Sequence, residues 1–441
     1  MKSDMLSTAR EGAALARRCG AQDAAVVAYR SRQVSVEWRD GKLEKIGEST
    51  TRGLALELFA DGRWASVSTS DLRPDALARF VADAVALTRK LEPDPFRALP
   101  DPALYRGQAS LALDLVDPGV GSLSSARRRE MCREAEEAAR GGPGADRLVS
   151  VSTSFGDGLH ESWRVHTNGF EGERRATDFW ISAVVSARDA DGRRPEEWDA
   201  AGARHLAELP AAGEVGRRAA ERARARLGAR KAPSEVTALV VDGRAAGRLV
   251  SALLDPMGGG SLQQRRSFLE GKVGQVIGSP LLSLDDDPLR PRALGSRLFD
   301  SEGLAARRFP LFDGGRLASY YLDTYYARKL GLTPTTRSTS NLTWRTGPEG
   351  QEGLLRSVGD GFLVTGFLGG NSNSTTGDFS LGMNGFRIRG GAQAEPVAEM
   401  NASGNLLTLW KALAAVGNDP YPWSPLRTPT LVFEGVAVAG T

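Results

Sequence analysis

Histidine and cysteine, two of the side chains that most often bind transition metals, are scarce in this sequence of 441 residues. It contains only His160, His166, His205, Cys19 and Cys132. Both cysteines fall in stretches with helical periodicity and have no adjacent histidine, so we expect reduced thiols rather than a disulfide or a nucleophile. The sequence also lacks an apolar run of membrane-spanning length, and residues 1–20 lack the apolar centre of a signal peptide. These absences favour a cytoplasmic protein.

An excess of charge of one sign is also missing. The 57 basic residues nearly balance the 54 acidic ones, which leaves a net charge of +3. This balance argues against a nucleic-acid partner and against a membrane partner. One helix, expected over residues 214–227, carries several arginines, namely Arg217, Arg218, Arg222, Arg224 and Arg226. Because no aromatic residues interleave with them, we interpret them as a solvated helix face.

Common catalytic and metal-binding signatures are absent as well. There is no G-x-S-x-G elbow and no G-x-x-x-x-G-K-[ST] phosphate loop. His160 and His166 would face the same side of one strand, but no third ligand is near in sequence, so we expect an exposed or half-buried sheet face. His205 is expected on the surface. The aspartates at 285–287 lack the alternating spacing of a calcium loop and predict a solvated turn before Pro288.

What the first half does contain is a succession of short strands, turns and helices. Strands are expected at residues 33–38, 42–46, 51–59, 63–68, 148–155, 161–167 and 175–187. Turns are expected at residues 40–41, 61–62, 156–158 and 168–169, the first as a type I′ hairpin turn. Helices are expected at residues 4–18, 124–140 and 214–227. A further helix is expected to start at Pro74, with Ser70 or Asp71 as its N-cap.

The second half is richer in glycine and turns. Residues 232–234, Ala-Pro-Ser, mark the best domain boundary. A strand at 237–241 leads into a helix at 243–254 capped by Asp242, and another helix is expected at 405–415. We therefore predict an α+β protein. It has a mixed α/β N-terminal half with antiparallel strands and surface helices, divided into residues 1–112 and 113–231, and a β-rich, barrel-like C-terminal domain over residues 232–441.

One glycine-rich block, residues 369–386, reads GGNSNSTTGDFSLGMNGF. Phe379, Leu381, Met383 and Phe386 punctuate it, so it is expected to pack under a sheet rather than to act as a flexible tether. The polar residues of the block have two interpretations: they satisfy a tight turn, or they line a cavity and pair with a peptide backbone. The candidates for peptide contact are Asn371, Asn373, Thr375, Thr376 and Asp378.

Several short motifs in a shared order resemble the TldD/PmbA family (peptidase family U62, once called modulators of DNA gyrase). The matching segments are LGARKAP at 227–233, RSFLEGKVG at 266–274, DDP at 286–288, FDSEG at 299–303, TGDFS at 376–380, GNL at 404–406 and VGND at 416–419. The N-terminal half matches more loosely, at residues 51–53 and 65–72. Each motif is weak alone, but their common order makes the resemblance strong.

The resemblance implies a fold with a mixed α/β half and a β-rich half, and proteolysis of unfolded or small peptides in a cavity between subunits. Peptide maturation is one context that it implies. TldD-like members carry a zinc-binding H-E-x-x-x-H on the helix that opens the C-terminal domain. PmbA-like (TldE-like) members lack this motif and pair with a TldD-like subunit.

The corresponding positions in this sequence are Gly243 and Arg248 for the two ligands and Arg244 for the general base. Glycine has no side chain, and a guanidinium is a cation without an acceptor, so neither can bind zinc. Arg244 cannot take a proton from water. We therefore expect no catalytic residue, metal or cofactor in this chain, and zinc only in a TldD-like partner. Arg244 and Arg248 are left with two interpretations: pairing within the domain, or contact with a peptide carboxylate or an acidic partner surface.

Three hypotheses follow. The first is a PmbA/TldE-like subunit that forms a heterodimer with a TldD-like subunit, or a homodimer without it, and helps to position a peptide substrate. The second is a self-sufficient homodimeric peptidase with relocated catalytic groups, for which Asp300, Glu302 and Asp378 are the carboxylates to test. The third is a regulator of DNA transactions, against which the near-neutral charge argues.

Overall fold

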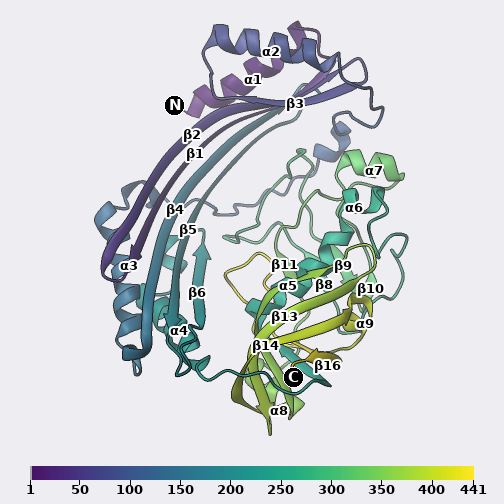
Figure 1. The fold of residues 1–441 in the computed structure, drawn as a ribbon. Coiled ribbons are helices and arrows are strands. Elements are labelled where there is room, and N and C mark those ends of the chain that lie inside the picture. Colours follow the sequence, from purple (N-terminus) through teal and green to yellow (C-terminus); the bar gives the residue numbers. More distant parts are fainter. Residues whose placement is uncertain (1) are drawn as a thin grey trace.

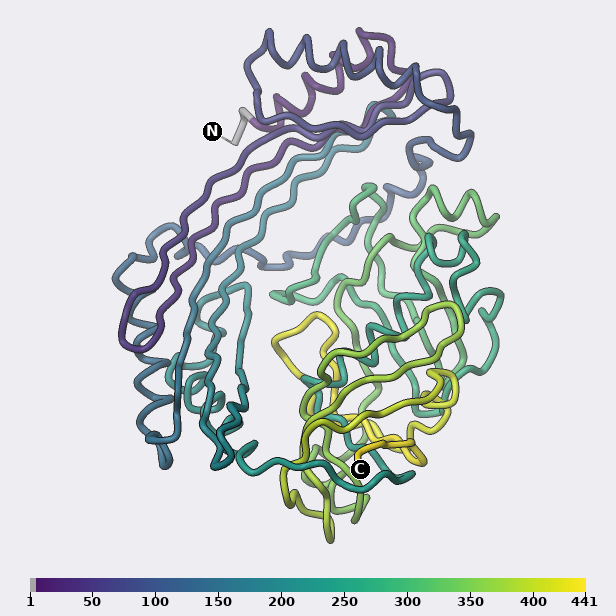
Figure 2. Tube along the Cα trace, in the orientation of Figure 1, coloured from purple at the N-terminus to yellow at the C-terminus, as the bar shows by residue number. Residues whose placement is uncertain are grey.

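The chain folds into two halves, seen clearly in the ribbon of Figure 1 and the tube of Figure 2. The computed structural model describes residues 2–441. A long, strongly curved sheet forms most of the N-terminal half, and the C-terminal half sits on its concave side. The helices of the N-terminal half lie on the outer, convex side of the sheet. The predicted α+β class, with antiparallel strands and a barrel in the C-terminal half, is confirmed.

The long sheet is antiparallel throughout and has the strand order β3-β2-β1-β4-β5-β6. Its strands are β1 (Asp23–Arg39), β2 (Lys42–Ala60), β3 (Arg63–Thr69), β4 (Leu148–His166), β5 (Glu171–Ala187) and β6 (Glu196–Ala203). The expected turn residues Asp40, Gly41, Asp61 and Gly62 all have positive φ, as type I′ hairpins require. The two hairpins are therefore confirmed, although β1 and β2 run much further than predicted, whereas β3 matches the predicted strand to within one residue.

Alternation along the strands separates the two faces of this sheet. Phe155 and Trp163 of β4, and Phe179 and Ile181 of β5, are buried beneath the helices. The alternate residues, such as Ser154, His160 and Ser162 of β4, face the concave side and are only partly covered. Two helices, α1 (Lys2–Arg18) and α2 (Pro74–Thr88), cover one end of the convex face, and α3 (Ser125–Arg140) and α4 (Ala212–Ala225) cover the other.

Three expectations for the N-terminal half are wrong. Residues 42–46 and 51–59 are parts of the single strand β2. Residues 156–158 do not turn but continue β4, where Asp157 forms a buried ion pair with Arg128 of α3, with Nη2 to Oδ1 at 2.9 Å. Neither Ser70 nor Asp71 caps α2. Arg73 occupies the cap position without a side-chain hydrogen bond, and Pro74 at the first helical position removes one of the N–H groups that would lack a partner.

The arginines of α4 are less solvated than expected. Arg218 and Arg222 both pair with the buried Asp199 of β6, and Arg226 is itself buried against Glu197. These ion pairs between arginines of α4 and carboxylates of β6 attach the helix to the edge of the sheet. The arginines therefore anchor the helix, so the interpretation as a freely solvated face is wrong for this part of it.

Short helical turns lie between the longer elements, two of them in the segment that links α2 to α3. They are η1 (Pro102–Tyr105), η2 (Val120–Ser122), η3 (Ala145–Arg147), η4 (Leu206–Glu208) and, in the C-terminal half, η5 (Asp255–Met257). Leu104 accepts a backbone hydrogen bond of 2.9 Å from Ala305, and Leu115 accepts one of 2.9 Å from Thr177. The segment thus binds to the C-terminal half and to β5, and it holds the two halves together.

A second sheet organises the C-terminal half, in the order β14-β13-β12-β7-β16-β15. Its strands are β7 (Glu235–Val241), β12 (Gly361–Ser372), β13 (Asp378–Arg389), β14 (Ala392–Asn405), β15 (Leu413–Val416) and β16 (Leu431–Ala439). An additional pairing of β14 with β16 closes the strands from β14 to β16 into a barrel. Helix α5 (Gly243–Leu254) buries Leu249 and Leu253 in the same apolar core as Phe362 and Phe433.

The rest of this half is a small sheet and short helices. The sheet has the order β10-β9-β8-β11, with β8 (Leu284–Asp286), β9 (Phe309–Asp313), β10 (Arg316–Leu317) and β11 (Leu342–Trp344). The helices are α6 (Gly259–Gln263), α7 (Thr324–Leu330), α8 (Gln351–Val358) and α9 (Leu406–Lys411). No helix among residues 2–441 is long and apolar enough to cross a membrane.

Two expectations for the C-terminal half are also wrong. The helix predicted at 405–415 ends at Lys411, and the chain continues as β15, because Leu413 and Val416 pair with the barrel strand β16. The aspartates at 285–287 do not form a solvated turn. Asp286 lies in β8 with no exposed surface and accepts hydrogen bonds from the Tyr321 hydroxyl at 2.7 Å and from Ser340 N at 2.8 Å.

Candidate functional site

The site begins where β7 ends and α5 starts. Asp242 is the N-cap of α5, as predicted, and its carboxylate accepts a hydrogen bond of 2.8 Å from Arg244 N. Gly243 is the first residue of the helix. A Cβ atom placed on Gly243 would lie 2.6 Å from the carbonyl oxygen of Thr428. The first helical position is therefore closed to any side chain unless the backbone moves.

Arg244 points from this first turn toward the long sheet. Its Nη1 donates a hydrogen bond of 3.2 Å to the carbonyl oxygen of Trp198 in β6, and its guanidinium carbon lies 5.5 Å from the centre of the Trp198 ring. The same guanidinium is 3.5 Å from the Asp242 carboxylate, and the side chain is 7% exposed. Arg244 thus has an ion pair within its own domain and also connects α5 to the other half.

Arg248 lies one turn further along and is exposed. Its Nη2 is 3.4 Å from the carbonyl oxygen of Gly370, in the last part of β12. Asp255, at the other end of α5, is close enough for Arg248 to oppose the rise in its pKa that burial causes. Both arginines therefore have partners in this chain, and Arg248 keeps most of its surface in solvent.

These residues do not fit a zinc ion. The two positions at which the family resemblance implies zinc ligands hold a glycine and an exposed guanidinium, neither of which has a lone-pair donor in its side chain. The position between them is filled by the Arg244 cation. Among the side chains that the structure describes, no group of three or more from His, Cys, Asp and Glu is arranged to hold a metal ion.

The glycine-rich block at 369–386 is a hairpin of β12 and β13. Its four predicted apolar anchors are buried. At the tip, the Asn373 side chain accepts from Thr375 N at 2.9 Å, and Thr376 Oγ1 donates to Asp378 at 2.7 Å. Asn405 Nδ2 also donates to Asp378 at 2.9 Å, and these two bonds lower the pKa of Asp378. The tip residues thus satisfy a turn, while Asn371 pairs with Ser380 across the hairpin.

The three histidines are dispersed. His160 is half-buried and contacts Asp178 through Nε2 at 2.6 Å. His166 is buried, with Nδ1 3.0 Å from the Tyr105 hydroxyl, and burial lowers its pKa to about 3. His205 was expected on the surface, and this is wrong: it is 9% exposed, with Nε2 2.9 Å from the Asp114 carbonyl oxygen. The segment that links α2 to α3, which contains Asp114, covers His205.

Both cysteines are free thiols, as expected. Cys132 of α3 is fully buried between this helix and the long sheet, and burial raises the pKa of its thiol to about 11. Cys19 is half-buried at the end of α1. A thiol with a raised pKa is a poor nucleophile, so Cys132 is part of the core.

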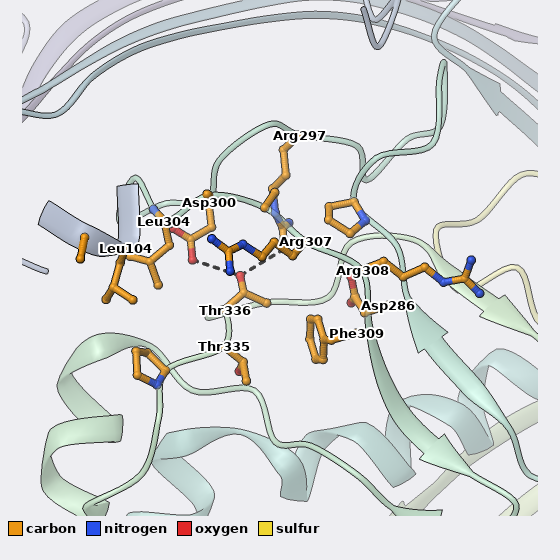
Figure 3. Close-up of a pocket in the computed structure, with 15 residues that line it drawn as sticks. Leu104, Asp286, Arg297, Asp300, Leu304, Arg307, Arg308, Phe309, Thr335 and Thr336 are labelled. Atoms are coloured by element: carbon orange, nitrogen blue, oxygen red, sulfur yellow. Dashed lines mark hydrogen bonds between the residues drawn. The ribbon is translucent and has the colours of Figure 1, made fainter. Parts of the chain in front are cut away.

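A cavity of about 380 Å³ lies between η1 and the small sheet, as Figure 3 shows. Asp300 is on its wall, 5% exposed, and accepts from Glu302 N at 2.9 Å, Leu304 N at 3.0 Å and Thr336 Oγ1 at 3.1 Å. Arg297 donates to the same Thr336 oxygen at 3.3 Å. Sequence reasoning identified Asp300 as a carboxylate to test but missed the cavity and Arg297, because the wall is assembled from segments far apart in the chain.

Glu302 lies beside this cavity. Its carboxylate accepts hydrogen bonds from Thr324 Oγ1 at 2.6 Å and Thr324 N at 2.8 Å. Burial, together with the neighbouring Asp300 and Asp323, raises the pKa of Glu302 to about 7 against these hydrogen bonds. Burial also raises the pKa of Asp300. The third carboxylate singled out from the sequence, Asp378, is bonded to different partners at the tip of the barrel hairpin.

Comparison with known proteins assigns a family to each part of the chain. Residues 24–88 match the profile described as PmbA/TldA metallopeptidase domain 1, residues 118–227 match the central domain, and residues 234–440 match the C-terminal domain. Metalloprotease PmbA of Escherichia coli O157:H7 is 29% identical over 96% of this chain and 93% of its own length.

Solved structures show the same fold. A Bacteroides thetaiotaomicron protein, solved as a proposed modulator of DNA gyrase, is 39% identical and has a TM-score of 0.95 over 99% of this chain and 98% of its own. TldE from Thermococcus kodakarensis has a TM-score of 0.88 at 20% identity, covering 98% of this chain and 100% of its own. The first of these relatives is close enough in sequence to indicate common descent, and the second shows the fold alone.

Proposed function

This chain belongs to the PmbA/TldD family of metallopeptidases, and we propose that it is a subunit without a zinc site of its own. It would pair with a TldD-like subunit that carries H-E-x-x-x-H, shape the cavity that the two subunits share, and position unfolded or small peptides for cleavage. Zinc would then be held by the partner. The supporting observation is the start of α5, where this chain places Gly243, Arg244 and Arg248.

The packing around α5 supports this proposal beyond the residue types. Gly243 is pressed against the Thr428 carbonyl, so the backbone itself leaves no room for a ligand there. Arg244 occupies the region between α5 and Trp198 with a positive charge, which would repel a divalent cation. The start of α5 thus serves as a contact between the two halves of the chain, and it has no group that can activate a water molecule.

Zinc content and peptidase activity test the proposal together. The chain purified alone should contain far less than one zinc per protomer by elemental analysis, and it should not cleave casein or short peptides. A mixture with a TldD-like relative should form a heterodimer by light scattering and should cleave these substrates. The matched control is the same mixture in which both histidines of the relative's motif are alanine, which should be inactive. Stoichiometric zinc in the isolated chain, or cleavage by it, would overturn the proposal.

One observation favours a second candidate, a self-sufficient peptidase. Glu302 has a pKa of about 7 beside the buried carboxyl of Asp300, and a carboxyl that titrates near neutrality can serve as a general acid or base. If the isolated chain cleaves peptides, Glu302→Gln should abolish cleavage and Asp378→Asn, at the exposed turn, should not. Equal loss in both variants, or in neither, would argue against this arrangement.

A further inference from the structure

The concave face of the long sheet contains a second hollow. Figure 1 shows this face turned toward the C-terminal half. It has a volume of about 380 Å³ and is formed by β1, β4, β5 and the residue that follows the end of β6. Side chains on its wall include Tyr29, Ser31, His160, Ser162, Arg174 and Arg204. Arg174 lies directly opposite Ser162 in the register of β4 and β5. Arg30 and Glu161, which form an ion pair with each other, also line the hollow, so Arg174 and Arg204 bring two further guanidinium groups to it.

Arg204 is held rigidly at one side of this hollow. It is 8% exposed, and its Nη1 donates a hydrogen bond of 2.9 Å to the Thr177 carbonyl, while Nη2 donates to the Leu294 carbonyl of the C-terminal half. Its Nε has no acceptor among residues 2–441. Asp178 is its acidic neighbour and is also bonded to His160. Arg204 thus supplies a fixed positive charge that is only partly offset.

Arg174 has no hydrogen-bond or ion-pair partner of its own in the described part of the chain. Among the groups that the structure describes, none forms a hydrogen bond or ion pair with its guanidinium, whereas Arg175, on the opposite face, pairs with Glu161 at 2.8 Å. Burial and the cations of Arg297 and Arg204 lower the pKa of Arg174 to about 10, so it remains charged at neutral pH. A partly buried cation among other cations is unfavourable unless an anion completes the group.

We propose that Arg174 and Arg204 form a binding site for a carboxylate group on the concave face of the long sheet. The guanidinium of Arg174 presents a planar fork that matches the two oxygens of a carboxylate, and the Ser162 hydroxyl lies on the same wall. Asp178, near Arg204, offsets one of the two positive charges, so the group leaves a net charge of about +1 for a ligand to neutralise. The ligand we expect therefore carries a single negative charge.

Two sources can supply this chemistry, the C-terminal carboxylate of a peptide and a small organic acid. We favour the peptide, and this choice rests on the function proposed above, whereas the carboxylate site itself does not. The hollow is large enough to hold the last residue of a peptide chain. A bound C-terminus would fix the direction in which a peptide lies along the sheet.

Calorimetric titration of the full chain with matched probes tests the site. The probes are N-acetyl-trialanine, its C-terminal amide, N-acetylalanine and inorganic phosphate. N-acetyl-trialanine should bind at least ten-fold more tightly than its amide. Arg174→Gln should weaken this binding at least ten-fold, while the control Arg175→Gln, which changes the adjacent arginine on the other face, should stay within two-fold of the unmodified chain. The melting temperature of Arg174→Gln should be unchanged or higher, because an unpaired cation is removed.

The outcomes separate this site from the proposed function. If N-acetylalanine binds through Arg174 and the peptide acid does not, the carboxylate site stands and the peptide role loses its support. The proposal is overturned if acid and amide bind alike, if no carboxylate probe binds, or if binding survives Arg174→Gln. Tighter Arg174-dependent binding of phosphate would overturn the carboxylate assignment. A fall of several degrees in the melting temperature of Arg174→Gln would indicate a structural arginine instead.

Discussion

Arg244 Nη1 lies 3.2 Å from the carbonyl oxygen of Trp198, and this hydrogen bond joins the helix that opens the C-terminal domain to the edge strand of the long sheet. The side chain is almost fully covered, and the Trp198 ring lies beside the guanidinium. Where zinc-binding relatives are expected to place a general base, this chain has a residue that connects its two halves.

This relationship predicts a loss of stability when Arg244 is changed. Arg244→Gln removes the charge that faces Asp242 and the contact with Trp198, and we expect the free energy of unfolding to fall by about 1–2 kcal/mol. Arg248→Gln is the matched control: its side chain is exposed and makes one contact of 3.4 Å, so its effect should stay within about 0.5 kcal/mol. Urea denaturation of both variants measures the difference, and equal effects would contradict the assigned role of Arg244.

Gly243 and Gly247 form a second matched pair in α5. Gly243→Ala would place a Cβ atom 2.6 Å from the Thr428 carbonyl oxygen, so we expect a loss of about 1–3 kcal/mol. Gly247→Ala meets nothing closer than Leu426 at 3.7 Å and should gain up to about 1 kcal/mol from its better helix propensity. Thermal denaturation should move the two melting temperatures in opposite directions. A stable Gly243→Ala variant would show that the start of α5 can accept a side chain.

Glu302 should make stability depend on pH. Its pKa is raised to about 7 in the folded chain, above the ordinary value of 4.5, so the folded state binds the proton more tightly. The resulting stability is fully present below about pH 4.5 and is lost as the pH rises to about 7, by about 2 kcal/mol after allowance for partial exposure. Unfolding measured between pH 4.5 and 8 should therefore show a smaller decline for Glu302→Gln. Parallel curves for the two proteins would contradict the raised pKa.

His166 should act in the opposite direction and at lower pH. Burial lowers its pKa to about 3 from the ordinary 6.5. Between these two pH values the imidazole is protonated in the unfolded chain but neutral in the folded chain. Its contribution to stability is present above about pH 6.5 and is lost as the pH falls toward 3. His166→Gln should therefore lose less stability between pH 6.5 and 4 than the unmodified chain. His160→Gln, at a half-buried ring, serves as the control for an unrelated histidine loss.

Local patterns are enough to predict much of the fold. The hairpin turns at Asp40 and Asp61 are recognisable because a type I′ turn needs two residues that tolerate positive φ. The cap and extent of α5 follow from Asp242 and an amphipathic stretch. The strand lengths do not follow, since Gly156 and Gly158, which resemble turn residues, are drawn into β4 by pairing on both sides.

In the candidate sites, too, some features follow from the sequence and others only from the tertiary structure. That Gly243, Arg244 and Arg248 cannot bind zinc is a property of their side chains, and the residue types alone are enough to establish it. The contact of Arg244 with Trp198 is different, because the two residues are 46 positions apart and no local pattern links them. The same holds for Asp286, which the local pattern places in a solvated turn and which Tyr321 and Ser340 bury.

The sequence by itself determined the family resemblance, the residue types at the start of α5 and the local turns and caps, because each depends on neighbouring residues. Only the tertiary structure decided which charges are paired. Arg174 and Arg175 are adjacent and chemically identical, but side chains alternate between the two faces of β5. Arg175 therefore pairs with Glu161, whereas Arg174 faces the concave side without a partner. Burial and pairing depend on segments brought together by the sheet and the barrel, and that information is not contained in the spacing along the chain.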